Sequence, residues 1–367
     1  MKLRRALLII LTLILSLPLM TSCAPLTENN TIEEIAPVTF LSLSEGSEGK
    51  IKISTLAPPL TNEPKKLITK EVHMLEEGRK YLSLNYYREY KLGQLRMLFI
   101  SESLARKGIA PLITSLLLDP ETTQRLYLVV VDGNFDEYII ANTEKQKDLE
   151  YFLYRMFKHY EKKQQGTMTV INLHRFLQKY HNPLADPVLP VFEATADDFM
   201  YKGTGLFQKD KMAGKLSLRQ DHIFQLLDNV NYIKLLPLPE FSILLGQVRS
   251  KVDLHWNRGD SIYAVNVNLY ARLVEYQGDR YLGNTNNLME LQSEIENFLK
   301  ERTTELLQKM QKWDVDPLSM GYVALHPFSK PISGEEWQKT KRSLNYQVKV
   351  HLTLNPLPAI PSYQYHR

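Results

Sequence analysis

Hydrophobic and polar positions along residues 95–133 follow the order of a strand, two helices and a second strand. The compact apolar run Leu98–Ser101 predicts the first strand, and Ser101 or Ser103 can cap the helix behind it by accepting a bond from a free backbone N–H. Gly108 predicts the end of that helix. Pro111 suits the first turn of the next helix, where its missing N–H is harmless.

The second helix is expected to end at Leu118, because Asp119 precedes a proline and is pushed away from helical backbone angles. The stretch RLYLVVVDG at 125–133 is continuously apolar, which is typical of a strand buried on both faces of a mixed or parallel sheet. The whole segment therefore predicts a β-α-β unit.

Three further segments of the first half show a recognisable period. Residues 37–44 alternate as a strand does, with a one-residue change of phase that predicts a bulge. Residues 168–183 predict a short strand that runs into a helix. An amphipathic helix is expected over 144–166, with a buried stripe of Leu149, Phe152, Met156 and Tyr160.

Prolines mark the end of the first half. Pro183, Pro187 and Pro190 crowd the stretch PLADPVLPVFEA, which predicts an extended connector. We therefore expect a domain boundary near residue 190.

The second half has a different pattern of hydrophobic and polar residues. Residues 203–217 predict a β-hairpin around a charged turn at 209–211. Residues 261–276 form a long strand with one apolar face and one polar face, the polar face including Asn266, Asn268 and Arg272. The clearest helix covers 286–313, and residues 346–354 alternate as a last strand. Strands with one solvent-exposed face, together with one long helix to cover the other face, indicate an α+β fold with mixed sheets and packed helices.

The N-terminus has the pattern of a lipoprotein signal. Basic residues at 2, 4 and 5 precede an apolar run over 6–20, which is shorter than the roughly 20 residues of a membrane-spanning helix. The run ends in Met20-Thr21-Ser22-Cys23, which resembles a bacterial lipobox, and only a thiol is nucleophilic enough to take the diacylglyceryl group. Two acyl chains on Cys23 give stable anchoring. An ordinary secretory signal beside a chance cysteine and an uncleaved signal anchor remain alternatives.

These patterns divide the chain into five parts. They are a signal peptide 1–22, a lipidated tether 23–36, an N-terminal α+β domain 37–190, a C-terminal α+β region 191–356 of one or two subdomains, and a tail 357–367.

Charge excludes a nucleic-acid footprint. The chain has 45 basic and 41 acidic side chains, and removal of the signal with its three basic residues leaves 42 against 41. No run of five or more lysines and arginines occurs. Cys23 is the single cysteine, so disulfides and thiolate metal sites are excluded.

Known catalytic and ligand-binding patterns are missing. The sequence has no G-x-S-x-G, H-E-x-x-H or P-loop motif, and the glycines at 203 and 205 lack the third glycine of a dinucleotide fingerprint. His159, His174 and His181 lack a metal-ligand spacing. The acidic pair of DVDP at 314–317 is expected in a helix-ending turn, since no acidic residue closes a calcium loop. We therefore predict a non-enzymatic protein without metal or cofactor.

Three motifs carry a resemblance to a known family. LFISESLARKGIAPLITSLLLDPE at 98–121, the hairpin GTGLFQKDKMAGKLS at 203–217, and WDVDPLSMGYVALHPFSKPISGEEWQKTKRSL at 313–344 occur in order. Together they resemble the Ger(x)C (GerAC) family, the C-subunit lipoproteins of spore germinant receptors. The first 60 residues depart from the family, since Cys23 is followed by Ala-Pro where members often have Trp-Asp.

The resemblance implies three α+β domains without enzymatic activity. It also implies a lipid-anchored subunit on the outer face of the endospore inner membrane, beside A- and B-type integral membrane subunits. Under this reading the second half would divide near residue 215. Glu102, Arg106 and Gly108 are candidate partner-interface residues. Their structural alternatives are, in the same order, a first-turn carboxylate favoured by the helix dipole, a solvated side chain and a helix stop.

Two other functions stay open at this point. A solute-binding lipoprotein of a membrane transporter would need a deep cleft between two similar lobes, and the halves here differ in texture. A lipid-anchored hydrolase is disfavoured by the missing nucleophile motifs. The sequence leaves direct contact with a germinant undecided.

Overall fold

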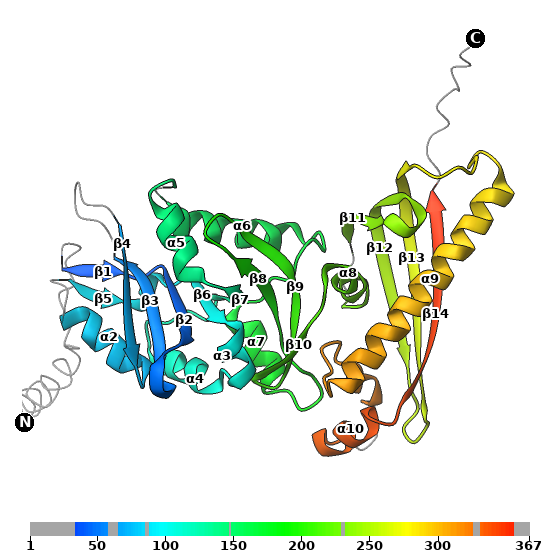
Figure 1. The fold of residues 1–367 in the computed structure, drawn as a ribbon. Helices are drawn as coiled ribbons and strands as arrows, with labels where there is room; N and C mark the ends of the chain where they lie inside the picture. Colours follow the sequence, from blue (N-terminus) through cyan, green and yellow to red (C-terminus); the bar gives the residue numbers. More distant parts are fainter. Residues whose placement is uncertain are drawn as a thin grey trace, which may run out of the picture.

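The computed structural model describes residues 34–57, 65–84, 88–146, 148–228, 232–325 and 331–355. Two main sheets organise this part of the chain. The first sheet has eight strands in the order β10-β9-β8-β7-β6-β2-β3-β4, and the second sheet has four in the order β11-β12-β13-β14. The molecule is elongated, with β1 and α2 at one end, the second sheet at the other, and α8 between the two sheets (Figure 1). This is the predicted α+β fold with mixed sheets and packed helices.

The strands are β1 (Ile35–Pro37), β2 (Phe40–Glu45), β3 (Ile51–Ala57), β4 (Lys66–Val72), β5 (Glu89–Lys91), β6 (Met97–Ser101), β7 (Tyr127–Gly133), β8 (Val188–Ala194), β9 (Phe199–Gln208), β10 (Lys211–Lys215), β11 (Ile233–Leu238), β12 (Ile243–His255), β13 (Ile262–Tyr276) and β14 (Asn345–Asn355). Strands β1 and β5 pair in parallel as a small separate sheet.

The α-helices are α2 (Leu75–Leu84), α3 (Glu102–Lys107), α4 (Ala110–Leu118), α5 (Phe135–Thr143), α6 (Leu149–Lys163), α7 (Leu173–Tyr180), α8 (Leu218–Leu227), α9 (Thr285–Lys312) and α10 (Gly334–Lys341). Short 3-10 helices are η1 (Ser47–Gly49), η2 (Leu92–Gln94), η3 (Pro239–Phe241) and η4 (Met320–Ala324).

Helices cover both faces of the first sheet. On one face α2, α3, α4 and α7 enclose a core that includes Leu98, Ile113 and Phe176. On the other face α5 and α6 enclose a second core that includes Phe99 and Phe157. The central strands are therefore buried on both sides, which explains their continuous apolar runs.

The predicted β-α-β unit is confirmed. Strands β6 and β7 pair in parallel, with α3 and α4 between them in the sequence. Ser101 caps α3 through a bond from the backbone N–H of Leu104, and Gly108 ends it with a φ of 125°. Pro111 lies in the first turn of α4, which ends at Leu118 as expected.

The change of phase in residues 37–44 has another cause than a bulge. β2 pairs in continuous register with β3 and β6. The chain leaves the small sheet after β1, and β2 is then buried on both faces, with Phe40 in one core and Leu41 in the other. A strand that is buried on both faces needs apolar side chains at its odd and at its even positions, and this explains the change of phase.

Two expectations for residues 144–183 were wrong in part. The predicted helix is α6, but its buried residues are Leu149, Leu153 and Phe157, while Phe152 is exposed. The expected strand before α7 is reduced to an isolated bridge between Tyr127 and Asn172. The helix after it, α7, forms as predicted.

The proline-rich stretch is a buried strand instead of a connector. β8 lies between β7, its parallel neighbour, and β9, its antiparallel neighbour. The expected boundary near residue 190 falls inside this strand. The predicted hairpin at 203–217 is present as β9 and β10, and it completes the edge of the first sheet. The change from first to second sheet comes after residue 215, where α8 begins.

The second sheet matches its sequence pattern. Along β13 the alternate residues 263, 265, 267, 269, 271 and 273 are buried, and along β14 Val348, Leu352 and Leu354 are buried. The predicted long helix is α9, whose Leu291, Ile295 and Leu299 join the same core. In Figure 1 α9 crosses in front of the strands, so the sheet has one covered face.

Candidate functional site

The predicted lipidation residue, Cys23, lies outside the described residues. Within the ranges that the structure does describe, no helix has the length and apolar character needed to cross a bilayer. In the same ranges, no group of three or more histidine, cysteine, aspartate and glutamate side chains is arranged to hold a metal ion.

Two of the candidate interface residues form an ion pair on α3. Arg106 Nη2 lies 2.6 Å from Glu102 Oε1, one turn apart on the helix. The other oxygen of Glu102 accepts a bond of 3.0 Å from Lys215 Nζ of β10. Lys215 also contacts Asp132 at the end of β7. This network joins α3 to the edge hairpin, and the Arg106 side chain remains almost half exposed.

Gly108 holds the corner between α3 and α4 against the tip of the hairpin. Its φ of 125° is left-handed, and an added Cβ would lie 2.7 Å from Asp210 Oδ2. The hairpin tip bonds the same corner, because Asp210 accepts from the backbone N–H groups of Ile109 and Ala110. The structure thus brings the three candidates to one edge of the first sheet, and the contacts described for them are within the chain.

A buried charged cluster joins the two sheet regions, and sequence reasoning missed it. Asp186 lies before β8, and its carboxylate accepts a bond of 2.8 Å from the backbone N–H of Asp316. Lys341 Nζ of α10 lies 3.7 Å from Asp186 and 3.4 Å from Asp314. Asp186 and Lys341 are almost fully buried, and their charges are compensated within the cluster, where Lys209 is a second cation for Asp186 and Asp314 a second carboxylate for Lys341.

Asp316 is the acceptor at the centre of this cluster. Its carboxylate receives bonds from the backbone N–H groups of Met320 and Gly321 and from the indole N–H of Trp337. Burial raises the pKa of Asp316 to about 6, although these bonds favour the ionised form. The DVDP segment is therefore a structural turn, as its sequence predicted, and Asp316 in it accepts hydrogen bonds from the surrounding chain.

A second buried polar network links β9 to α8. The Asp221 carboxylate accepts bonds from Tyr201 and Thr204, and Gln225 donates to Thr169, which contacts Thr204. Burial raises the pKa of Asp221. Every polar group named here has a partner, so the network fixes α8 against the first sheet.

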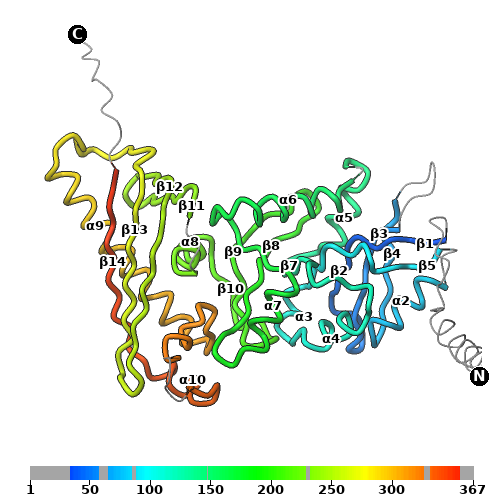
Figure 2. Tube along the Cα trace, turned by 180° about the vertical axis from the view of Figure 1, so that it is seen from behind, coloured from blue at the N-terminus to red at the C-terminus, as the bar shows by residue number. Residues whose placement is uncertain are grey.

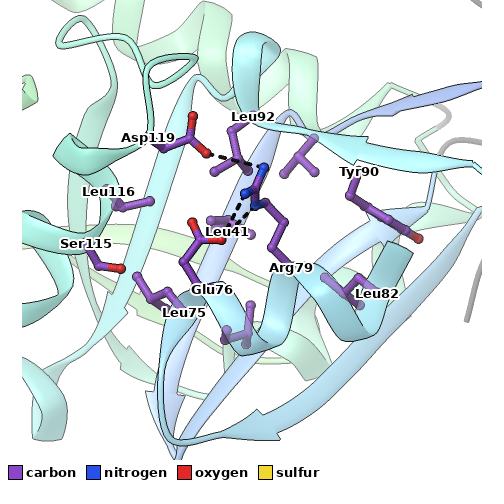
Figure 3. A pocket seen from close by; sticks show the side chains of 12 residues that line it. Leu41, Leu75, Glu76, Arg79, Leu82, Tyr90, Leu92, Ser115, Leu116 and Asp119 are labelled. Atoms are coloured by element: carbon purple, nitrogen blue, oxygen red, sulfur yellow. Dashed lines mark hydrogen bonds and ion pairs between the residues drawn. The ribbon is translucent and has the colours of Figure 1, made fainter. Parts of the chain in front are cut away.

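A small cavity beneath α2 is the pocket drawn in Figure 3. Aliphatic side chains and Tyr90 line most of it, and Arg79 enters from α2 toward Glu76 and Asp119. Its volume is about 30 Å³, which is room for one or two waters. This cavity cannot hold a nutrient-sized molecule.

The second sheet has an open face on the side opposite α9, where no helix of the described residues covers the strands (Figure 2). Rows across the strands place Arg249 beside Tyr270, and Lys251 beside Asn268. Arg272 and Lys349 lie on the same side of the sheet. We call this surface the open sheet face, and its members are Arg249, Lys251, Asp253, Asn266, Asn268, Tyr270, Arg272, Lys349 and His351. Its basic residues outnumber its single carboxylate, so this face favours an acidic partner.

Comparisons with known proteins agree along the chain. A family model described as "Spore germination protein N-terminal domain" matches residues 28–194, and one described as "Spore germination B3/ GerAC like, C-terminal" matches residues 202–356. The first match ends at the last residue of β8, and the second begins within β9.

A curated relative and a solved structure add to these matches. The chain is similar to the spore germination protein GerQC of Bacillus cereus, with 22% identity over 265 residues that cover 70% of this chain and 73% of the relative. It shares its fold with the crystal structure of the GerBC protein, at a TM-score of 0.53 and 13% identity, over 86% of this chain and 96% of that one.

Proposed function

Because the chain belongs to the GerAC-like family of spore germination proteins, we propose that it is the lipoprotein subunit of a nutrient germinant receptor. In this role it acts by assembly with integral membrane subunits and not by catalysis. The observation that carries the proposal is the ordered match of both family domains, which together extend over nearly the whole chain after the signal.

Anchoring follows from the N-terminal pattern. Cys23 receives the diacylglyceryl group before signal cleavage leaves it as the first residue, and it then holds the folded body on the outer face of the spore inner membrane. Two acyl chains on this one residue are enough for stable anchoring.

The open sheet face is the surface that we propose for docking the partner subunits. It carries four lysine and arginine side chains against one carboxylate, and it includes the polar strand positions Asn266, Asn268 and Arg272 that the sequence singled out. The edge around Glu102, Arg106 and Gly108 is a second, weaker candidate, because its charged groups already have partners within the chain.

The solute-binding alternative is not favoured. It requires two similar lobes around a cleft, whereas the first sheet is covered on both faces and the second on one. Helix α8 and its buried polar network lie between the two sheets.

Deletion of the gene, followed by complementation with wild-type or Cys23→Ala protein, tests the proposal. We expect spores of the deletion strain to lose germination with at least one nutrient and the wild-type gene to restore it. Cys23→Ala should leave the membrane fraction and fail to restore germination, because its anchor is gone.

Ser22→Ala is the matched control, since it keeps a small residue beside an intact thiol, and it should behave as wild type. Normal germination of the deletion strain with every nutrient would contradict the receptor role. Unchanged membrane retention of Cys23→Ala would contradict lipidation at this residue.

A further inference from the structure

Helix α6 presents aromatic side chains to solvent on the face opposite its core contacts. Leu149, Leu153 and Phe157 are buried against the first sheet. Tyr151 and Phe152 point the other way and are 50% and 49% exposed. Exposed aromatic residues at successive positions of a helix are not needed by the fold, because the stripe that packs on the sheet is already complete.

The same face is cationic. Arg155, Lys158, Lys162 and Lys163 are exposed, and no residue described by the structure forms an ion pair with any of them. The Arg155 guanidinium lies 4.4 Å from the centre of the Tyr151 ring. Lysine and arginine side chains therefore surround the aromatic pair without compensation from within the chain.

Two acidic residues of α6 are turned inward. Glu150 accepts a bond of 2.6 Å from Lys65, and Glu161 accepts one of 2.5 Å from the Tyr127 hydroxyl. Asp148, which precedes the helix and is exposed, lies 3.7 Å from Lys65. The outward side of α6 thus keeps its positive charge.

We propose that this α6 face, formed by Tyr151, Phe152, Arg155, Lys158, Lys162 and Lys163, binds the anionic surface of a lipid bilayer. The inference rests on the proposed function, in which the chain is held at a membrane, and adds a second contact to it. Aromatic side chains enter the headgroup region while basic side chains bind lipid phosphates.

A bilayer fits this surface better than a protein partner does. Protein interfaces are depleted in lysine, whereas lysine makes up half of the α6 face. Lysine stems lie along apolar surface and carry the ammonium group to a polar boundary, as at a membrane interface. On the neighbouring helix α5, Ile140 is also 64% exposed. Figure 1 shows α5 and α6 along the outer side of the first sheet, where no other element covers them.

The consequence is a defined orientation. A lipid on Cys23 alone leaves the body free to turn on its tether, whereas a second contact through α6 fixes which side of the first sheet faces the bilayer. The open sheet face, at the other end of the molecule, is then presented in a constant direction to neighbouring subunits.

Vesicle sedimentation tests this without the lipid anchor. The mature chain from residue 23, carrying Cys23→Ala, is mixed with vesicles of equal parts phosphatidylglycerol and phosphatidylcholine or of phosphatidylcholine alone. We expect binding to the anionic vesicles that weakens with added salt. Reversal of three charges, Arg155→Glu, Lys158→Glu and Lys162→Glu, should raise the lipid concentration for half-binding on the order of tenfold or more.

The matched control reverses three charges on the open sheet face, Arg249→Glu, Lys251→Glu and Arg272→Glu. It changes the net charge equally and should lose much less binding. An equal loss in both variants, or no binding to anionic vesicles, would overturn the proposal. If the protein does not bind vesicles but binds the purified integral subunits through α6, this face contacts a protein partner, and the membrane proposal is overturned as well.

Insertion of the aromatic pair gives an independent readout. Phe152→Trp should be quenched by brominated phosphatidylglycerol vesicles, while Met289→Trp on exposed α9 should not. Equal quenching at both positions would contradict a specific α6 contact. These assays use neither spores nor a lipidated chain, so a negative result would not contradict the proposed receptor role. Conversely, normal germination of the deletion strain would not contradict vesicle binding through α6.

Discussion

Asp316 shows how one side chain decides the local architecture of the region between the sheets. Its carboxylate collects three N–H donors from the segment after α9 and from Trp337, and these groups would otherwise be buried without partners. Burial works against the charge, and raises the pKa to about 6. Asp316 therefore stabilises the turn after α9, and its protonation state changes when the pH passes through about 6.

The first prediction concerns pH at this residue. The folded-state pKa of Asp316 lies above its ordinary value of 3.8, so the folded protein binds the proton more tightly than the unfolded chain. The contribution of Asp316 to the free energy of unfolding should be largest below pH 4 and fall by about 3 kcal/mol as pH rises through 6. Asp316→Asn cannot titrate and should lack this fall.

Urea unfolding of both proteins between pH 4 and 7 measures the effect. Because all other groups are shared, the stability of Asp316→Asn relative to wild type should rise across this window, whatever offset the lost acceptor causes. A difference that stays constant with pH would contradict the assignment.

At the scale of elements, tight turns are fixed by contacts that come from distant strands. Gly108 ends α3 by a local rule, but its conformation also clears space for the hairpin tip at Asp210. The glycine thus links a helix stop in one segment to the register of an edge hairpin about a hundred residues later.

Gly108→Ala should destabilise the protein by about 2 to 3 kcal/mol, since it adds a clash to a strained φ of 125°. Gly49→Ala is the control, because Gly49 has a φ of 76° with no atom within 4 Å of an added Cβ. Its cost should be about 1 kcal/mol, from backbone conformation alone. Equal costs in urea unfolding would show that the contact with Asp210 contributes nothing.

The elements that sequence predicted well are those with local signals. Ser101, Gly108 and Pro111 mark helix ends by capping and backbone rules, so α3 and α4 could be located within a residue. The strict alternation of β13 and β14 likewise reports one buried face.

Elements set by distant pairing were predicted poorly. Prolines argued against a strand at β8, yet β7 and β9 enclose it on both sides. The stripe of α6 was misassigned because aromatic residues stand on both its faces, and periodicity cannot separate a core aromatic from an exposed one. No local signal reveals the partners of Asp186 or Lys341, which lie more than a hundred residues apart in sequence.

At the scale of the molecule, the two sheet regions are held by a joint of unlike contacts. Charged groups around Asp186 and Lys341 form one part of it. Packing of Trp313, at the end of α9, on Gly214 of β10 forms another, and here the absence of a side chain lets the indole approach the first sheet. A rigid joint would keep the α6 face and the open sheet face in a constant orientation relative to each other, which would suit the contacts proposed for these two faces.

Gly214→Val tests this joint. An added Cβ would lie 2.5 Å from Trp313 Cζ2, so the indole has to move and the regions lose packing. We expect a loss of about 1 to 3 kcal/mol in the free energy of unfolding, a change in tryptophan fluorescence and faster proteolysis near residues 215–217. Gly93→Ala, with no atom within 4 Å of its added Cβ, should leave the fluorescence and cleavage rate unchanged. If Gly214→Val is cleaved no faster than Gly93→Ala, packing at Trp313 does not hold the regions together, and the charged cluster, the polar network at α8 and the shared apolar core carry that role.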